Sequence, residues 1–461
     1  MTRSSHCIDP AVLREYDIRG KVGRQLGEAD AHAIGRSFAT VVRRGGGRRV
    51  VVGYDGRLSS PMLEAALVAG LAASGVEVVR IGLGPSPMLY WAAATLDVDG
   101  GIQVTGSHNP RDHNGFKLVH QGGSFFGEQL AGLAALAADG DWEEGTGDVT
   151  DAAVIDDYVA RLFAGYGGGA FRIGWDCGNG ASGPVVERLV KLLPGEHHLL
   201  FTEVDGNFPN HHPDPTVEAN LADLRALVAE KKLDFGLAFD GDGDRIGAVD
   251  GRGRVVWGDQ LLAILAEPVL RLAPGAAIIG DVKSSQYLFD RVEELGGRAV
   301  MWKTGHSPIK RKMKELDAPL AGEMSGHIFF AEGWYGFDDA HHAAVQLIRA
   351  LHVTGRDLTA HRDAMPELAS TPDIRLKAAD GAAIVVAVAE RVVASGAAVE
   401  RVDGLRVTSE DGWWLLRASN TEDAVTVRAE GRDRPALDRL LATVRAELAR
   451  HDLHFDRRPG K

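Results

Sequence analysis

A mainly apolar segment that runs directly into alternating aspartates and glycines is the feature of this chain that most restricts its fold. Residues 233–239 (LDFGLAF) have the composition of a buried strand, and Asp240, Asp242 and Asp244 follow at once, separated by single glycines. Glycine lets the backbone turn tightly at such a point. Since open α/β sheets bind ligands beyond the carboxyl ends of their strands, the segment predicts an α/β sheet with a polar site at this strand end.

The three aspartates indicate a cation site. Carboxylates this close repel one another unless a cation joins them, and all-oxygen ligation selects a hard ion, Mg²⁺ before Ca²⁺ or Mn²⁺. A solvated acidic turn is the simpler alternative, because Asp-Gly repeats are common in turns. An EF-hand calcium loop would need Gly at its sixth position and Glu at its twelfth, where this chain has Arg245 and Gly251, so we reject it. Arg245 suits a phosphate beside the metal instead.

Composition limits the partners. The 461 residues are enough for about three or four packed domains. A formal net charge of −13 disfavours nucleic acid and favours small-molecule chemistry, with a locally basic pocket if the substrate is an anion. Cys7 and Cys177 show neither metal-ligand spacing nor a disulfide framework. Without the apolar core of a signal peptide or a membrane span, we expect a cytoplasmic protein. We also expect a monomer or weak dimer.

Strand and helix patterns alternate along most of the chain and predict three similar α/β domains, over residues 1–150, 151–255 and 256–367. Expected strands are 49–52, 77–81, 102–104, 171–175, 199–204, 277–281 and 299–302, and expected helices are 63–74, 152–163, 184–193 and 285–295. Residues 366–372 (PELASTP) indicate a linker. The sequence pattern then changes and predicts strands at 404–408, 413–417 and 425–429 and a helix at 435–450. These elements predict a smaller α+β domain over 368–461.

For two loops, the residues alone do not establish a catalytic or a dinucleotide-binding role. Ser107 lies in TGSHNP (105–110), but it lacks a Gly-x-Ser-x-Gly elbow, and His108 is expected to point away from it. By itself, Ser107 indicates a turn serine. Residues 178–183 (GNGASG) fit a dinucleotide-binding fingerprint, but short glycine patterns give many false positives. We interpret that segment as a tight turn into a helix.

Five motifs together resemble those of the α-D-phosphohexomutases. Residues 105–110 resemble the phosphoserine loop of that family, 240–245 its metal loop, 322–327 (GEMSGH) its sugar-recognition loop and 417–422 (RASNTE) its phosphate-binding loop, while 15–20 (EYDIRG) resemble its opening. The motifs occur in the family's order and span essentially the whole chain. Met324 favours the bacterial phosphomannomutase/phosphoglucomutase branch, because the phosphoglucosamine branch typically has Gln there.

The resemblance implies four domains, three with mixed sheets, around a central cleft. It also implies interconversion of hexose 1-phosphate and hexose 6-phosphate, with mannose or glucose as the sugar. Ser107 would carry a phosphoryl group, a hexose 1,6-bisphosphate would be the intermediate and activator, and Mg²⁺ would bind Asp240, Asp242, Asp244 and the phosphorylated Ser107. Phosphoglucosamine mutase and a Mg²⁺-dependent sugar phosphatase are the alternatives.

The resemblance also implies roles for residues in other loops. Lys117 and His306 are both candidates for the general base, and the choice between them stays open. Arg19, Lys117 and Arg245 are candidates for the positive charge that flanks the phosphoryl group. Expected substrate-binding residues are Tyr16, Arg245, Lys283, His306, Glu323, Ser325, Arg417, Ser419, Asn420 and Thr421. A phosphate loop on a separate last domain suggests hinge closure over the substrate.

Overall fold

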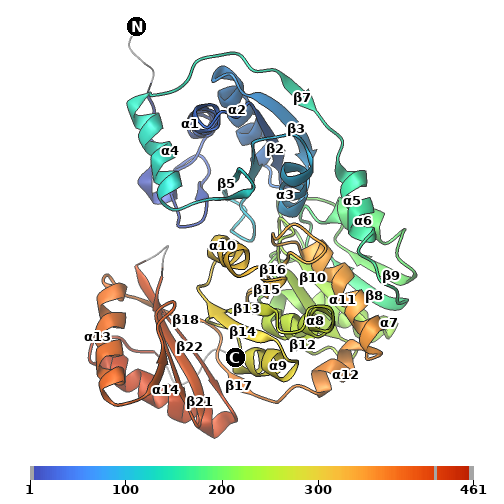
Figure 1. Ribbon diagram of the computed structural model, residues 1–461, viewed down its shortest axis with the longest axis vertical. Coiled ribbons are helices and arrows are strands. Elements are labelled where there is room, and N and C mark those ends of the chain that lie inside the picture. The colour runs from blue at the N-terminus through green and yellow to red at the C-terminus, as the bar shows by residue number, and fades with distance from the viewer. Residues whose placement is uncertain (1–4, 420–422, 456–461) are drawn as a thin grey trace.

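The computed structural model describes residues 5–419 and 423–455, and within them the chain forms four β-sheets, each built from its own stretch of sequence. The four parts follow one another along an arc, with the first and the last at its ends (Figure 1). Three α/β parts with mixed sheets followed by a smaller α+β part confirm the predicted fold class. Among the residues described, no helix has both the length and the apolar character that a membrane span requires.

The first part is a seven-stranded mixed sheet in the order β1-β5-β4-β2-β3-β7, with β6 beside β5. Successive residues of its central strand serve two cores: Val50 and Val52 pack with α1 and α2, whereas Val51 packs with α3. After a short 3₁₀ helix at Pro10–Val12, the strands are β1 (Ile18–Lys21), β2 (Arg49–Tyr54), β3 (Glu77–Leu83), β4 (Gly100–Val104), β5 (His113–His120), β6 (Gly123–Phe125) and β7 (Val149–Asp151). The helices are α1 (Glu28–Arg44), α2 (Ser60–Ala73), α3 (Ser86–Thr95) and α4 (Glu128–Asp139).

The second part has a five-stranded sheet ordered β12-β11-β10-β8-β9, and the third has a four-stranded sheet ordered β14-β13-β15-β16. A single buried apolar cluster runs through α3, β10, α8 and α11, so the first three parts pack together continuously. The strands are β8 (Phe171–Asp176), β9 (Gly195–Leu200), β10 (Phe235–Phe239), β11 (Ile246–Asp250), β12 (Val255–Val256), β13 (Ala277–Asp281), β14 (Arg298–Trp302), β15 (Leu320–Gly322) and β16 (Ile328–Phe330). The helices are α5 (Ile155–Phe163), α6 (Gly183–Leu189), α7 (Ala222–Lys231), α8 (Gly258–Leu272), α9 (Gln286–Glu294), α10 (His306–Leu316), α11 (Ala340–Thr354) and α12 (Leu358–Asp363), with a 3₁₀ helix at Glu218–Leu221.

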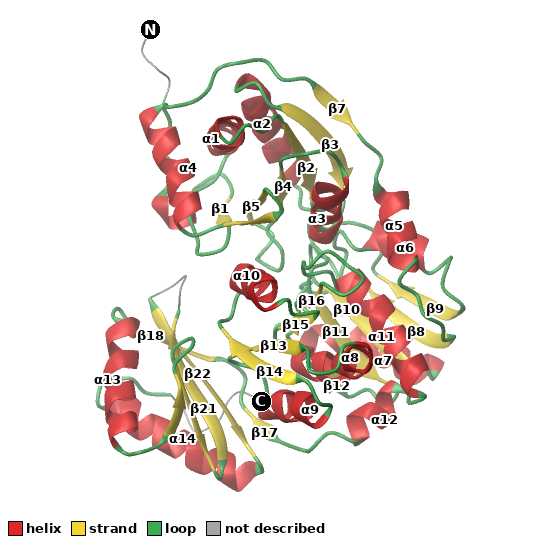
Figure 2. Cartoon of the chain, viewed as in Figure 1, coloured by secondary structure: helices red, strands yellow, loops and turns green. Residues whose placement is uncertain are grey.

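The last part is an antiparallel sheet with two helices on one face (Figure 2). Trp414 and Leu416 of β21 point to these helices, while Trp413 and Leu415 form a small cluster with Val282 of the third part. The alternation lets one strand build its own core and dock on the neighbouring part. The elements are β17 (Ala369–Ser370), β18 (Ile374–Lys377), α13 (Gly381–Ala394), β19 (Ala398–Glu400), β20 (Leu405–Ser409), β21 (Gly412–Ala418), β22 (Ala424–Gly431) and α14 (Arg434–Ala449).

Three local expectations were wrong. The strand expected at 199–204 is β9, Gly195–Leu200, because Phe201 takes a left-handed conformation (φ 52°) that ends it, and because an edge strand tolerates the polar residues 196–198. The helix expected to reach residue 193 ends at Leu189. The expected linker contains β17, which pairs with β22. The expected domain limits at 150 and 255 fall inside β7 and β12, and the limits themselves stay a prediction.

Candidate active site

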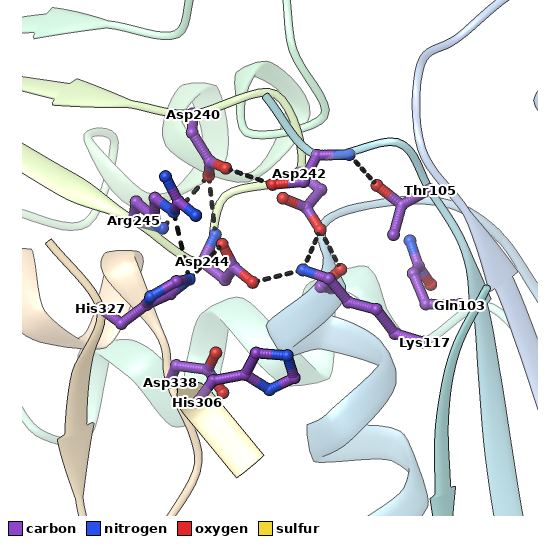
Figure 3. A network of polar contacts seen from close by, with 12 residues as sticks. Gln103, Thr105, Lys117, Asp240, Asp242, Asp244, Arg245, His306, His327 and Asp338 are labelled. Carbon is purple, nitrogen blue, oxygen red and sulfur yellow. Dashed lines mark hydrogen bonds and ion pairs between the residues drawn. The ribbon is translucent and has the colours of Figure 1, made fainter. Parts of the chain in front are cut away.

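Three buried carboxylates occupy the turn between β10 and β11. Asp240, Asp242 and Asp244 are fully buried, and one oxygen from each lies within 4.8 Å of the others. The turn is tied to its first aspartate, since Oδ1 of Asp240 accepts hydrogen bonds from the backbone N–H of Asp244 (3.1 Å) and of Arg245 (3.2 Å). These residues form the upper part of the polar network in Figure 3. The sequence 240–245 therefore gathers its carboxylates at one point.

Ser107 meets this turn from the first part of the chain. Its Oγ donates a hydrogen bond to Oδ2 of Asp240 at 2.8 Å, and its side chain is buried. Ser107 has a left-handed backbone (φ 48°), which non-glycine residues seldom adopt. The close approach also depends on Gly241, because a Cβ there would lie 2.5 Å from the carbonyl oxygen of Ser107. The structure thus brings together the serine and the aspartates that the sequence singled out.

A buried arginine holds the strained serine loop. The Arg57 guanidinium donates to the carbonyl oxygens of Ser107 (2.6 Å), Asn109 (2.6 Å), Pro110 (2.7 Å) and His113 (2.8 Å). The sequence reasoning assigned no role to Arg57. The available signal was its position just after β2, at the carboxyl end of a central strand.

Asp55 supports the same loop with two further hydrogen bonds. Asp55 Oδ2 accepts hydrogen bonds from Thr105 Oγ1 (2.7 Å) and from the backbone N–H of Gly106 (3.2 Å).

The expectation that His108 points away from Ser107 was wrong, because its Nδ1 lies 3.0 Å from Ser107 Oγ.

Lys117 places a positive charge among the aspartates. Its Nζ donates to Oδ2 of Asp242 (2.6 Å) and to Oδ2 of Asp244. Burial lowers the pKa of Lys117, but the two carboxylates outweigh burial and hold that pKa well above its usual value. Burial and the neighbouring carboxylates raise the pKa of Asp240 well above its usual value. Lys117 thus compensates Asp242 and Asp244, whereas the raised pKa of Asp240 reflects a charge that burial and its carboxylate neighbours leave poorly compensated.

The oxygens that remain suit a divalent ion. Oδ1 of Asp242 is buried and has no hydrogen-bond partner within the described part of the chain. Oδ1 of Asp244 likewise has no hydrogen bond there, although Nε2 of His327 lies 3.3 Å from it. Buried carboxylate oxygens of this kind are the donors that Mg²⁺ prefers. Asp240, Asp242, Asp244 and the oxygen of Ser107 thus fit such a cation.

Two residues near the amino terminus, Arg19 and Tyr16, also border the site. Arg19 donates to Oδ1 of Asn109 (2.8 Å) in the serine loop and to Asp17 (2.8 Å). Tyr16 donates from its hydroxyl to the carbonyl oxygen of Thr304 (2.9 Å), and its ring meets that of His306 edge-on at 5.8 Å between centroids. Tyr16 therefore joins the first part of the chain to the third. Burial, with the charges of Lys310 and Lys117, lowers the pKa of His306 well below its usual value, so this imidazole is neutral.

His327 is a site residue that the sequence reasoning missed. Its Nδ1 lies 2.8 Å from Oε2 of Glu323, and Nε of Arg245 lies 3.2 Å from its Nε2. Burial lowers the pKa of His327, but the charge of Asp244 and the hydrogen bond to Glu323 raise it to about 9. The signal was its place at the end of the GEMSGH motif, which received roles only for Glu323 and Ser325.

Four domain families of known proteins match the chain one after another. The four domains described as phosphoglucomutase/phosphomannomutase, alpha/beta/alpha domains I, II and III and C-terminal domain, match residues 11–143, 157–253, 257–368 and 374–447. The chain belongs to the phosphoglucomutase/phosphomannomutase family. It is similar to a phosphomannomutase/phosphoglucomutase of Pseudomonas putida, with 43% identity over 446 residues and 96% of each chain covered. The corresponding protein of Pseudomonas aeruginosa strain PAO1 is 40% identical over 450 residues, covering 97% of each.

A solved structure has the same overall arrangement. A family protein from Burkholderia thailandensis superposes with a TM-score of 0.92 at 42% identity, covering 97% of this chain and all of that one.

Residues 322–327, which resemble the family's sugar-recognition loop, contact their own neighbours. Glu323 accepts a hydrogen bond from the backbone N–H of Gly305 (2.7 Å) at one oxygen and contacts His327 at the other. Ser325 Oγ lies 3.2 Å from Nδ1 of His327. The loop is thus tied to residue 305, next to His306, and its carboxylate is already hydrogen-bonded on both oxygens.

Arg417, in the segment that resembles the family's phosphate-binding loop, lies beside the residues that precede His306. Arg417 pairs with Asp403 at 3.1 Å, and Oδ2 of Asp403 accepts a hydrogen bond from the backbone N–H of Thr304 (3.1 Å). The described part of the loop ends at Ser419, whose N–H donates to the carbonyl oxygen of Ala424 (2.8 Å). Lys283 is paired with Asp373 at 3.3 Å. Asn420 and Thr421 lie outside the described residues.

The glycine-rich segment 178–183 supports the aspartate turn. The backbone N–H of Ala181 donates to the carbonyl oxygen of Gly241 (2.9 Å). A Cβ at Gly180 would lie 2.8 Å from that same oxygen. Its glycines therefore allow the two turns to pack closely.

Proposed function

We propose that the protein is a phosphohexomutase that interconverts hexose 1-phosphates and hexose 6-phosphates, with Ser107 as the residue that carries the phosphoryl group. The observation that carries this proposal is the 2.8 Å hydrogen bond between Ser107 Oγ and Asp240 within a buried cluster of carboxylates. Family membership and the names of the relatives, phosphomannomutase/phosphoglucomutase, support mannose and glucose as the sugars. Family membership and these names give less support to glucosamine as the sugar.

The proposed reaction consists of two transfers. The phosphoryl group of phosphorylated Ser107 passes to the free hydroxyl of a hexose monophosphate: the Ser107 O–P bond breaks, a sugar O–P bond forms, and a base takes the hydroxyl proton while the Ser107 oxygen takes up a proton. The resulting 1,6-bisphosphate reorients within the site, and the Ser107 hydroxyl then loses its proton and takes the other phosphoryl group, so the other sugar O–P bond breaks and that sugar oxygen takes up a proton. No phosphate is gained or lost in the cycle, and the net change moves it between C1 and C6.

Charge stabilisation is the main task of the surrounding residues, because negative charge spreads over the phosphoryl oxygens during transfer. Arg19 and Arg245 border the serine and aspartate loops, and their guanidinium groups suit phosphoryl oxygens. Mg²⁺ held by Asp240, Asp242 and Asp244 would supply Lewis-acid stabilisation. The left-handed turn at Ser107 presents its oxygen to the aspartate turn that would hold the ion.

The neutral imidazole makes His306 our preferred general base. A base must be unprotonated before it can accept the hydroxyl proton, and the lowered pKa of His306 satisfies that condition. Lys117 is held protonated by Asp242 and Asp244 in the state described. Mg²⁺ at these carboxylates, as proposed here, would weaken that hold, so Lys117 remains the second candidate.

Recognition of the non-reacting phosphate is assigned to the last part of the chain. Arg417, Ser419, Asn420 and Thr421 would hold that phosphate, with Tyr16, Lys283, Glu323 and Ser325 at the sugar. The link from Asp403 to both Arg417 and Thr304 supports this assignment, because it places the loop beside His306. We further propose cytoplasmic action as a monomer or weak dimer, and the net charge of −13 supports the expectation that nucleic acid is not a partner.

Parallel assays with three substrates test the function. Mannose 1-phosphate, glucose 1-phosphate and glucosamine 1-phosphate are each supplied with the matching 1,6-bisphosphate, and both 6-phosphate product and inorganic phosphate are measured. We expect 6-phosphate from mannose and glucose substrates, little from glucosamine, and no product from the Ser107→Ala variant. Stoichiometric release of inorganic phosphate in place of the 6-phosphate would identify a phosphatase and contradict the proposal.

A further inference from the structure

Ser86 connects the first part of the chain to the aspartate turn of the second. It begins α3 between Pro85 and Pro87 and is fully buried. Its Oγ donates a hydrogen bond to Oδ2 of Asp242 at 2.5 Å, and its backbone N–H donates to the carbonyl oxygen of the same residue at 2.8 Å. One serine thus holds both the side chain and the backbone of an aspartate 156 residues away.

These contacts make the two carboxylate oxygens of Asp242 unequal. Oδ2 accepts from both Ser86 and Lys117, whereas Oδ1 is buried without a hydrogen-bond partner among the residues described. A carboxylate that is held at one oxygen cannot rotate about its Cβ–Cγ bond without losing that hydrogen bond. Oδ1 is therefore the oxygen that remains available to a cation.

Close packing keeps the turn from moving away from Ser86. Gly243 has a left-handed backbone (φ 72°), and a Cβ there would lie 2.9 Å from Cβ of Pro85 and 2.7 Å from Oγ of Ser182. Gly243 of the aspartate turn therefore packs directly against Pro85, which precedes α3, and against Ser182. The hydrogen bond of Ser86 is part of a packed junction between two parts of the fold.

We propose that Ser86 is a positioning residue of the cation site, whose hydroxyl orients Asp242 so that Oδ1 faces the ion. The proposal rests on the proposed function, because it requires a divalent cation at the three aspartates. Groups that orient metal ligands commonly change metal affinity by about 10- to 100-fold when they are removed. Ser86 acts through Asp242 and contacts neither the ion nor the substrate in this account.

Binding of Mn²⁺ to the full-length protein, measured by isothermal titration calorimetry without sugar phosphates, tests the proposal. Ser86→Ala removes the hydroxyl, Ser86→Cys is nearly isosteric but a poor donor, and Ser86→Thr keeps a hydroxyl. Thr95→Ala is the matched control, because it removes only a local hydrogen bond to the Trp91 carbonyl oxygen (2.8 Å) at the far end of α3. We expect the Kd for Mn²⁺ to rise about tenfold in Ser86→Ala and Ser86→Cys and to stay near the wild-type value in Ser86→Thr and Thr95→Ala.

The outcomes distinguish a failure of the proposed role of Ser86 from a failure of the proposed cation site. If the wild-type protein binds Mn²⁺ and both hydroxyl-free variants bind it equally well, Ser86 does not position the ligand, while the proposed function stands. Equal weakening in Ser86→Thr would assign the effect to packing and overturn the role of the hydroxyl. If wild-type protein and Asp242→Asn alike bind no Mn²⁺, the cation site itself is wrong and the inference falls with it. Ser86→Cys keeps the test decisive if Ser86→Ala does not fold.

Discussion

Oγ of Ser107 lies 2.8 Å from Oδ2 of Asp240, although 133 residues separate them in the chain. The contact joins a loop of the first sheet to a turn of the second, and it requires the left-handed backbone of Ser107 and the absence of a side chain at Gly241. The serine oxygen that we propose as the phosphoryl carrier is thereby placed against buried carboxylates that suit a cation.

Removal of the divalent ion should abolish turnover. EDTA is expected to inactivate the enzyme and added Mg²⁺ to restore it, because Asp240, Asp242 and Asp244 together provide the ligands. Asp242→Ala reduces three carboxylates to two, so the Mg²⁺ concentration for half-maximal rate should rise at least about tenfold. The exposed Asp156→Ala on α5 is the control and should behave as wild type. Full activity of Asp242→Ala at low Mg²⁺ would contradict the assignment.

The pH dependence of turnover should identify the base. Since the pKa of His306 is lowered, its neutral form persists below pH 6.5, and the acid limb of kcat/KM should lie below that value. His306→Gln should lower kcat by about 100- to 10,000-fold. A wild-type acid limb above pH 6.5 would argue against His306, as would a small effect in His306→Gln.

Arg57 should matter more for stability than an exposed arginine. Arg57→Ala would leave Asp55 and four loop carbonyl oxygens buried without their partner, and breaking a buried ion pair in this way costs about 3–5 kcal/mol. Arg439→Ala, which breaks an exposed pair with Asp411, is the control and should change little. Urea unfolding of both variants measures the difference. Equal effects would show that the loop does not depend on Arg57.

His342 should make the fold less stable in acid. Burial lowers its pKa to about 3, so the folded protein keeps this imidazole neutral while the unfolded chain takes up a proton near pH 6.5. Stability is complete above the unfolded pKa and falls as pH decreases toward the folded pKa. Between pH 7 and pH 5 the loss due to this group is about 2 kcal/mol.

A replacement that cannot titrate tests this contribution. In His342→Phe, which can keep the ring contact with Trp334, urea unfolding should show that part of the pH dependence removed. His352→Gln, at the exposed end of the same helix α11, should retain the wild-type dependence. An unchanged pH dependence in His342→Phe would contradict the argument.

The sequence predicted most of the architecture because apolar runs and turns mark the central elements. The strand 277–281 has the expected limits, as buried parallel strands have strong apolar runs. β9 was displaced because an edge strand is half exposed, so its polar residues conceal it. β17 was missed because two residues between prolines carry too little pattern, and only their partner β22 makes them a strand.

The candidate site was predictable where one motif contains the chemistry, as in the aspartate turn. Motif order also indicated Ser107, but no local pattern predicts that its oxygen meets Asp240. Ser86 and His327 were missed for the same reason, since their partners lie in distant segments or on a neighbouring loop. Such contacts follow from how the sheets pack, which the one-dimensional pattern does not contain.

Phosphorylation of Ser107 tests the central claim most directly. The protein is incubated with glucose 1,6-bisphosphate and Mg²⁺, and peptide mass spectrometry then locates and quantifies phosphate before and after addition of hexose monophosphate. The account predicts one phosphoryl group on Ser107, its loss to the added sugar, and none in Ser107→Ala. Turnover by a protein that never carries phosphate on Ser107, or by Ser107→Ala, would contradict it.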